Sequence, residues 1–100
     1  MKKSYLISLL TELKEIYHFE GCLNFDSGID AVLYKLSAGS EMMNDDEWVQ
    51  AASIYKTMAG SKSGFSDVYV ERGDAEKRVA LNVRLHEIRT ILWGVFGKIR

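Results

Sequence analysis

The sequence has no proline, no long apolar run and no pair of cysteines, and each absence narrows what the protein can be. Without proline, nothing in the 100 residues prevents a long helix. Every apolar run is far shorter than the ~20 residues that a membrane-spanning helix needs. Cys22 has no second cysteine to pair with, which is typical of proteins in a reducing cytoplasm. We therefore expect a cytoplasmic protein without a membrane segment.

The residues that are present indicate one small helical domain. Hydrophobic residues make up 47% of the chain and charged residues 27%, which suits a packed core under a hydrated surface. Apolar residues recur at helical spacing in four segments, separated by residues that start or end helices. We expect a single all-α domain over residues 1–100, arranged as a four-helix bundle. The predicted N-terminal caps are Ser4, Ser27 with Asp30, Asn44 and Asp74, and the predicted terminating glycines are Gly21, Gly39 and Gly60.

The fourth helix, roughly residues 75 to 98, carries a heptad-like apolar seam. Spacings of four and three residues are typical of a helix that packs along its whole length. At ~1.5 Å per residue this helix is ~36 Å long, so we expect it to span the whole domain as the central helix of the bundle. Val79, Val83 and Trp93 broaden its apolar face. The seam itself consists of Leu81, Leu85, Ile88, Leu92, Val95 and Ile99.

The connection before this helix, MAGSKSGFSDVYVERGD at 58–74, is rich in glycine and serine. A phosphate-binding loop needs G-x-x-x-x-G-K-[ST] between a strand and a helix, and GSKSG at 60–64 does not fit that pattern. FSDVYV alternates apolar and polar residues, which predicts a short extended or strand-like segment near 65–70. Three arrangements satisfy its backbone: pairing with residues 22–25, irregular packing on the bundle with Phe65 and Tyr69 filling core gaps, or strand addition to another protein.

The chain contains no catalytic or metal-binding motif. His18 and His86 are the only histidines, and neither has metal-ligand spacing. His86 falls beside the seam, so we expect it to be partly buried and hydrogen-bonded, whereas His18 suits the C-terminal end of the first helix. Cys22 would act as a nucleophile only beside a histidine, and otherwise as a small buried hydrophobe. We expect neither an enzyme nor a bound cofactor or metal.

The net charge of −1 conceals an uneven distribution. Residues 20–47 carry seven acids against Lys35 alone, and residues 56–100 carry nine lysines or arginines against five acids. Most of these acids lie at predicted helix starts, where the dipole favours them. A concentrated acidic face also steers and holds a basic partner, and Trp48 with Met42 and Met43 would supply apolar anchors beside it. The basic side is interrupted by Glu76 and Glu87, so we expect no nucleic-acid binding.

The second half of the chain resembles small uncharacterised bacterial families. The run IYKTMAGSKSGFSDVYV, followed by a helix with LNVRLHEIRTILW, is similar to their Met–x–Gly–Ser … Asp–apolar loop before a terminal helix. Members look like immunity or immunity-associated proteins of toxin systems, and the general plan is also similar to nuclease-colicin immunity proteins. The binding motif of the latter does not match residue by residue, and the charge of −1 is less acidic than theirs. The resemblance implies that residues 64–67 belong to the family's characteristic loop.

These observations predict a protein-binding module, in its most concrete form an immunity protein that neutralises a toxin by covering its active or substrate-binding surface. The partner would be another protein, most simply a basic toxin domain. One alternative is a structural or regulatory homodimer that uses the 81–99 seam between subunits. A second is a small enzyme or ligand binder that uses His86, Cys22 or the GSKSG loop. The predicted partner-binding residues are Glu41, Asp45, Asp46, Glu47, Trp48, Lys62, Phe65 and Asp67.

Overall fold

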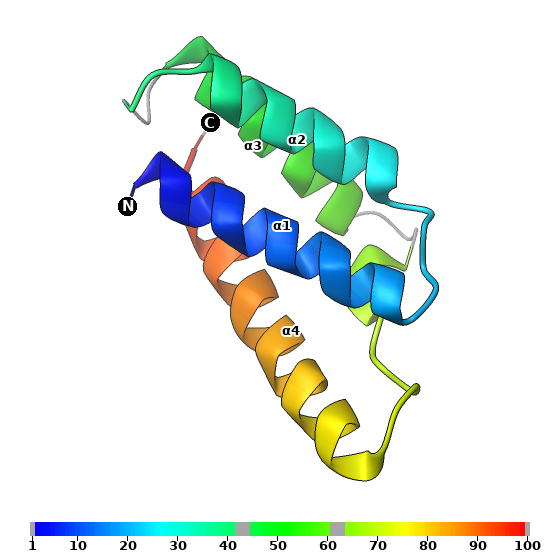
Figure 1. Cartoon of the computed structure of the whole chain (residues 1–100). Coiled ribbons are helices and arrows are strands. Elements are labelled where there is room, and N and C mark those ends of the chain that lie inside the picture. The colour runs from blue at the N-terminus through cyan, green and yellow to red at the C-terminus, as the bar shows by residue number, and fades with distance from the viewer. Residues whose placement is uncertain (1, 42–44, 61–63, 100) are drawn as a thin grey trace.

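The structure is a computed structural model that describes residues 2–41, 45–60 and 64–99. Four α-helices follow one another along the chain, which confirms the predicted all-α class (Figure 1). Between the third and fourth lies one turn of 3-10 helix, and no strand occurs in the described part of the chain. The elements are α1 (Lys3–Phe19), α2 (Asp26–Ala38), α3 (Asp46–Gly60), η1 (Phe65–Asp67) and α4 (Ala75–Phe96).

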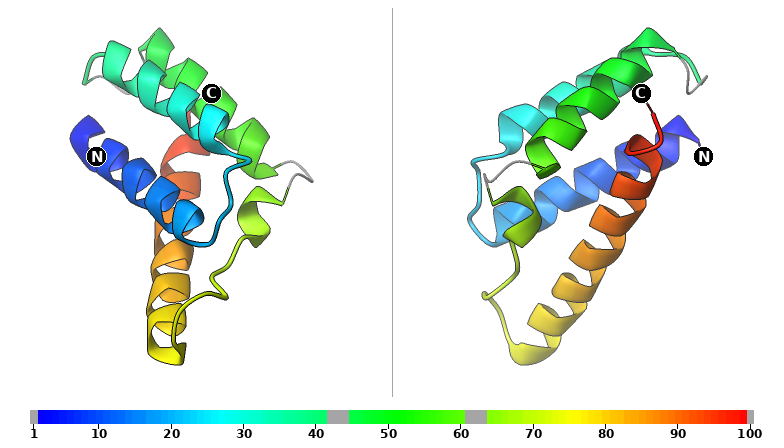
Figure 2. Two further views of the ribbon diagram at one scale, coloured as in Figure 1. Left: turned by 45° about the vertical axis from the view of Figure 1, so that its right-hand side comes forward. Right: turned by 180° about the vertical axis from the view of Figure 1, so that it is seen from behind.

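Helices α2 and α3 form an antiparallel hairpin that packs over α1 and the second half of α4 (Figures 1 and 2). The first half of α4, yellow in both figures, extends beyond the other helices, so the bundle is splayed at that end. None of the four described helices is long and apolar enough to cross a membrane. The core takes residues from every element: Leu6, Leu9, Leu10, Leu13, Ile16, Tyr17, Ile29, Val32, Leu36, Trp48, Ala51, Ala52, Tyr55, Phe65, Val70, Leu85, Ile88, Leu92, Phe96 and Ile99.

The apolar residues of α1 recur at helical spacing and form one buried stripe, which consists of Leu6, Leu9, Leu10, Leu13, Ile16 and Tyr17. The helix ends just before the predicted glycine. Gly21 has a φ of 81°, a left-handed conformation that glycine adopts without steric cost. Its N–H donates to the carbonyl of His18, and the Cys22 N–H donates to that of Tyr17. This pair of bonds is the Schellman arrangement, which satisfies the last carbonyls of a helix.

Two of the predicted N-terminal caps are wrong. Ser4 lies inside α1, whose N-cap is Lys2, and no side chain caps that end. Ser27 and Asp30 form no capping box, because α2 begins at Asp26 and has no side-chain cap. The cap of α4 is confirmed, since the carboxylate of Asp74 accepts the backbone N–H of Lys77 at 2.8 Å. Asn44, the predicted cap of α3, lies outside the described residues.

The seam of α4 packs inside the monomer. Leu85, Ile88 and Leu92 are fully buried, so they cannot face a second subunit in this fold. In this fold, a dimer through the 81–99 seam, the first alternative function, would have to use its half-buried members Leu81 and Val95. Val79, Val83 and Trp93, which the sequence placed on the buried face, are instead 64%, 56% and 48% exposed. The cause is geometric: α4 contacts other helices on one side only, and its first half extends past them.

Residues 64–72 form irregular packed backbone, the second of the three predicted arrangements. Phe65 fills the core as predicted, but the prediction for Tyr69 is wrong, because this side chain is 58% exposed. Gly64 has a φ of 92° and starts η1, after which Val68 is extended but joins no sheet. Side chains take the role of a partner strand. The amide of Asn82 accepts the Val70 N–H at 2.6 Å and donates to the Val70 carbonyl at 3.0 Å. The carboxylate of Glu20 accepts the N–H groups of residues 71 and 72, so the backbone is satisfied without a second strand.

The carbonyls of η1 and its neighbour are held by Arg89. One guanidinium nitrogen, Nη1, donates to the Val68 carbonyl at 2.7 Å and lies 3.4 Å from the Phe65 carbonyl. The same nitrogen donates to the Tyr17 hydroxyl, which in turn donates to the Phe65 carbonyl. Burial raises the pKa of Tyr17, so its hydroxyl keeps the proton that this second bond requires. Residues from α1, η1 and α4 are thereby joined in one network.

Candidate functional site

The structure separates the two predicted contact regions. The acids at 41–47 lie at the start of α3, whereas η1 follows the end of the same helix. Because α3 has 15 residues, the two regions are about 22 Å apart. Asp67 is exposed in η1, and Lys62 lies outside the described residues, as do Met42 and Met43. One small partner site therefore does not include both regions.

Trp48 and Phe65 are not surface anchors, and this part of the sequence prediction is corrected. Both side chains are 0% exposed. The Trp48 indole N–H donates to the Ser40 carbonyl at 2.6 Å, which satisfies its polar atom inside the turn between α2 and α3. Phe65 packs among three aromatic rings and fills the centre of the domain. Their size makes them attractive anchors in a sequence, but it equally suits the core.

At the start of α3, Asp45 performs the capping role. Its carboxylate accepts the backbone N–H of Glu47 at 2.8 Å and lies 3.4 Å from that of Ser40. The bond from Glu47, followed by those from Ser40, lowers the pKa of Asp45, so it is ionised at neutral pH. Glu47 is half-buried and pairs with Lys35 at 3.6 Å. Among the described residues, this is the one ion pair made by the acids of the segment.

The remaining two acids of the segment face solvent. Glu41 is exposed and lies 3.4 Å from the backbone nitrogen of Lys3 at the start of α1. Asp46 is exposed in the first turn of α3, where the helix dipole stabilises its charge. Neither carboxylate forms an ion pair with a cationic side chain of the described chain.

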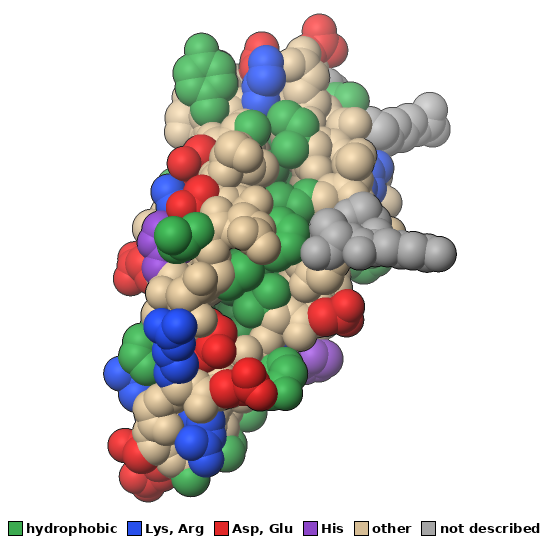
Figure 3. Space-filling model, turned by 90° about the vertical axis from the view of Figure 1, so that its right-hand side faces the viewer, with side chains coloured by type: hydrophobic (Ala, Val, Ile, Leu, Met, Phe, Trp, Pro, Cys, Tyr) green, Lys and Arg blue, Asp and Glu red, His purple; other side chains and the backbone are tan. Residues whose placement is uncertain are grey.

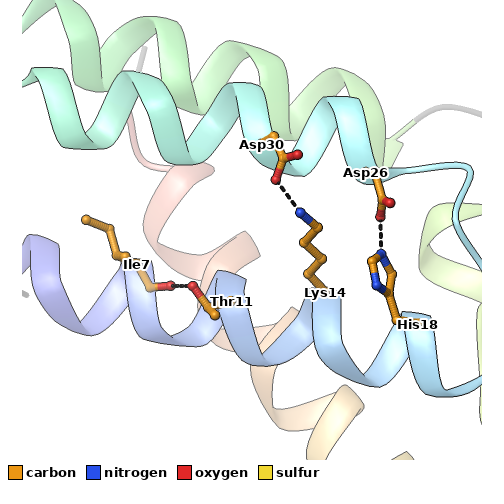
Figure 4. A network of polar contacts seen from close by, with 6 residues as sticks. All are labelled: Ile7, Thr11, Lys14, His18, Asp26 and Asp30. Atoms are coloured by element: carbon orange, nitrogen blue, oxygen red, sulfur yellow. Dashed lines mark hydrogen bonds and ion pairs between the residues drawn. The ribbon is translucent and has the colours of Figure 1, made fainter.

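The acids at the start of α2 link helices instead of capping one (Figure 4). Asp30 pairs with Lys14 of α1 at 2.7 Å, and Asp26 binds the Nε2 of His18 at 2.6 Å. The two pairs are one helical turn apart on both helices, so they fix the register between α1 and α2. These acids therefore have a structural role that helix-start statistics do not reveal.

An exposed tyrosine that the sequence analysis overlooked lies on the same hairpin. Tyr34 of α2 is 70% exposed, the most exposed aromatic side chain among the described residues. Its position outside the stripe of Ile29, Val32 and Leu36 was the available signal, because that stripe defines the buried face. Tyr34 is four residues, ~6 Å, from the end of α2 that leads into the acidic segment. We call Tyr34, Glu41, Asp45, Asp46 and Glu47 the acidic end.

The residues considered for catalysis do not form a site. His86 is exposed and makes no hydrogen bond within the described chain, so the prediction of a partly buried, bonded histidine is wrong. Cys22 is half-buried and packs on the core as a small hydrophobe. No group of three or more His, Cys, Asp or Glu that could hold a metal occurs among the residues described. Figure 3 shows cations and acids interspersed on the face that carries the α1–α2 turn, without a large patch of either sign.

No protein-family model matches the chain, and no curated protein or solved structure matches it at a significant level.

Proposed function

We propose that this chain is a protein-binding module whose acidic end contacts a basic surface of another protein. The observation that supports the proposal is that most of these acids have no cationic partner in the described chain. Four carboxylates lie within residues 41–47, and only Glu47 has a cationic partner within the described chain. Lowering of the Asp45 pKa keeps the group charged at neutral pH. Unpaired surface charges of one sign favour association with an oppositely charged partner.

The most concrete form of this function is an immunity protein, the role that the sequence resemblance implies. Its mechanism is occlusion: carboxylates occupy the positions at which a toxin's cationic cleft holds the phosphates of its substrate. Tyr34 supplies the apolar contact area that Trp48 cannot, because Trp48 is buried. Exposed carboxylates raise the association rate at low ionic strength. At 0.15 M salt this attraction is largely screened between charges farther apart than the Debye length of ~8 Å.

The test is capture of the partner by the tagged protein from a lysate of its source organism, with elution in steps of rising salt and identification by mass spectrometry. The identified partner is then titrated against the double variant Glu41→Lys with Asp46→Lys. Loss of at least ten-fold in affinity, mainly through a slower association rate, is expected.

A matched control is the double variant Glu15→Lys with Glu76→Lys. It makes the same change of net charge, on α1 and α4, with one exposed acid and one in the first turn of a helix. Equal binding of the two double variants would show that total charge matters and the acidic end does not. A partner that is released by detergent but not by salt would also contradict the proposal.

A further inference from the structure

A hollow of about 380 Å³ lies between η1 and the second half of α4. Its volume is within the range of small-molecule sites, which is about 300–1,000 Å³. None of the described residues that line it is acidic, and all but the glycine carry a side-chain hydrogen-bond donor. They are Ser66, His86, Arg89, Thr90, Trp93 and Gly94. A hollow with donors and no carboxylate favours an anionic ligand.

Arg89 offers the strongest of these donors. Its Nη1 is held by the Val68 carbonyl at 2.7 Å and by the Tyr17 hydroxyl at 3.2 Å. The Nε–Nη2 edge of the guanidinium makes no hydrogen bond within the described chain, and Arg89 has no carboxylate partner there. On Arg84 the same edge holds both oxygens of the Glu12 carboxylate, at 2.7 and 2.8 Å. The Arg89 guanidinium is therefore anchored on one side and presents on the other an edge that suits a carboxylate or a phosphate.

The other side chains of the hollow supply a flat wall and further donors. The indole of Trp93 is 48% exposed, so its ring can stack on a planar ligand. His86 and Thr90 are also exposed, and neither side chain makes a hydrogen bond to the residues that the structure describes. Asp67 and Glu87 adjoin lining residues in the sequence, but neither lines the hollow.

We propose that this hollow binds a small aromatic anion, a planar ring that carries a carboxylate or phosphate group. The oxyanion accepts two hydrogen bonds from the Nε–Nη2 edge of Arg89, and the ring stacks on Trp93. These two residues are four positions apart on α4, ~6 Å along the helix axis, so a ligand with a single ring reaches both. Because Nη1 is already anchored, little side-chain entropy is lost when the ligand binds.

The place of the hollow sets the expected affinity and its relation to the proposed function. The hollow is open to solvent, so it covers only part of a ligand, and we expect a dissociation constant of about 0.1–1 mM. It lies beside η1, which follows the end of α3, whereas the acidic end lies at the start of that helix. This inference therefore does not depend on the proposed function.

Fluorescence of Trp93 in the full chain tests the proposal, because the other tryptophan, Trp48, is fully buried. The probes are benzoate, phenyl phosphate, benzamide and inorganic phosphate. Benzamide keeps the ring without the charge, and inorganic phosphate keeps the charge without the ring. Benzoate or phenyl phosphate should bind about ten-fold or more tightly than both of these, and the tighter of the two identifies the anion. No change in emission with either at about 20 mM, well above a dissociation constant of ~1 mM, overturns the proposal.

Substitutions on α4 test the location. Thr90→Glu places a carboxylate in the hollow at an exposed position, so binding should weaken by about ten-fold or more with an unchanged circular dichroism spectrum. Ala80→Glu is the matched control, because it makes the same change of charge at an exposed position of the same helix, ~15 Å away, and should bind as wild type does. Arg89→Lys, checked for folding by the same spectrum, keeps the charge but not the two-donor edge and should also weaken binding. Wild-type affinity in Thr90→Glu or Arg89→Lys, or a fluorescence response that persists in Trp93→Phe, overturns the proposal.

Discussion

Replacement of Phe65 by alanine tests whether this residue stabilises the core or, as the sequence predicts, contacts a partner at the surface. Its ring is 0% exposed and packs against three aromatic rings, with centroid separations of 5.4 Å to Tyr17, 5.2 Å to Phe25 and 5.7 Å to Tyr55. Truncation of a buried phenylalanine removes its transfer free energy and leaves a cavity, at a cost of about 3–5 kcal/mol. The aromatic pairs, at about 0.5–1.5 kcal/mol each, favour the upper part of that range.

The consequence for the whole domain is large. Native proteins have unfolding free energies of about 5–15 kcal/mol, so a loss of about 3–5 kcal/mol removes at least about a fifth of the total. With an unfolding entropy of about 2.1 cal/mol/K per residue, the 100-residue chain should lose about 15–25 °C in Tm.

Urea denaturation monitored by far-ultraviolet circular dichroism gives the change in unfolding free energy. Tyr69→Ala is the control, because this aromatic residue four positions later is 58% exposed and should change stability by no more than about 0.5 kcal/mol. If Phe65→Ala also changed stability by less than about 1 kcal/mol, the packing assignment would be refuted and a surface role restored.

Four further substitutions test local features, each by chemical denaturation. Asp74→Ala removes the side-chain cap of α4 and should cost about 1 kcal/mol; no loss would mean that water replaces the cap. Glu12→Gln breaks a bidentate ion pair with Arg84, whose N···O distances are 2.7 and 2.8 Å. Because both side chains are about 40% exposed, we expect a loss of about 0.5–1 kcal/mol in the free energy of unfolding at pH 7. Hydrogen bonding from Arg84 lowers the pKa of Glu12 below its ordinary 4.5, so this stabilisation is present above pH 4.5 and is lost as the pH falls through the lowered pKa. Wild type and Glu12→Gln should therefore converge in acid, and a constant difference would argue against the pair. Gly21→Ala places a side chain at a φ of 81° and should cost about 1–2 kcal/mol, whereas Gly94→Ala, within α4 and with open space at its Cβ, should stabilise by up to about 1 kcal/mol.

The sequence predicts only part of the candidate site. The sequence located the carboxylates of residues 41–47 and the dipole reason for some of them. It did not distinguish Asp45, which caps α3, from Asp46, which faces solvent, because these adjacent acids differ only in the direction of their side chains. Tyr34 was predictable as exposed from the stripe of α2, but its nearness to the acids depends on how the hairpin is closed.

The sequence by itself determined the four helices, the buried stripe of α1 and the glycine that ends it, because these depend on spacing and on backbone conformations that single residues prefer. Only the tertiary structure decided which apolar residues are covered. Leu85 and Val83 have similar chemistry and lie on one helix, yet α1 and α3 cover the side that holds Leu85 and leave Val83 exposed. It also decided that Asn82 and Glu20 satisfy the backbone of residues 70–72 in place of a strand. Burial and long-range hydrogen bonds depend on neighbours from distant parts of the chain, and no local pattern specifies them.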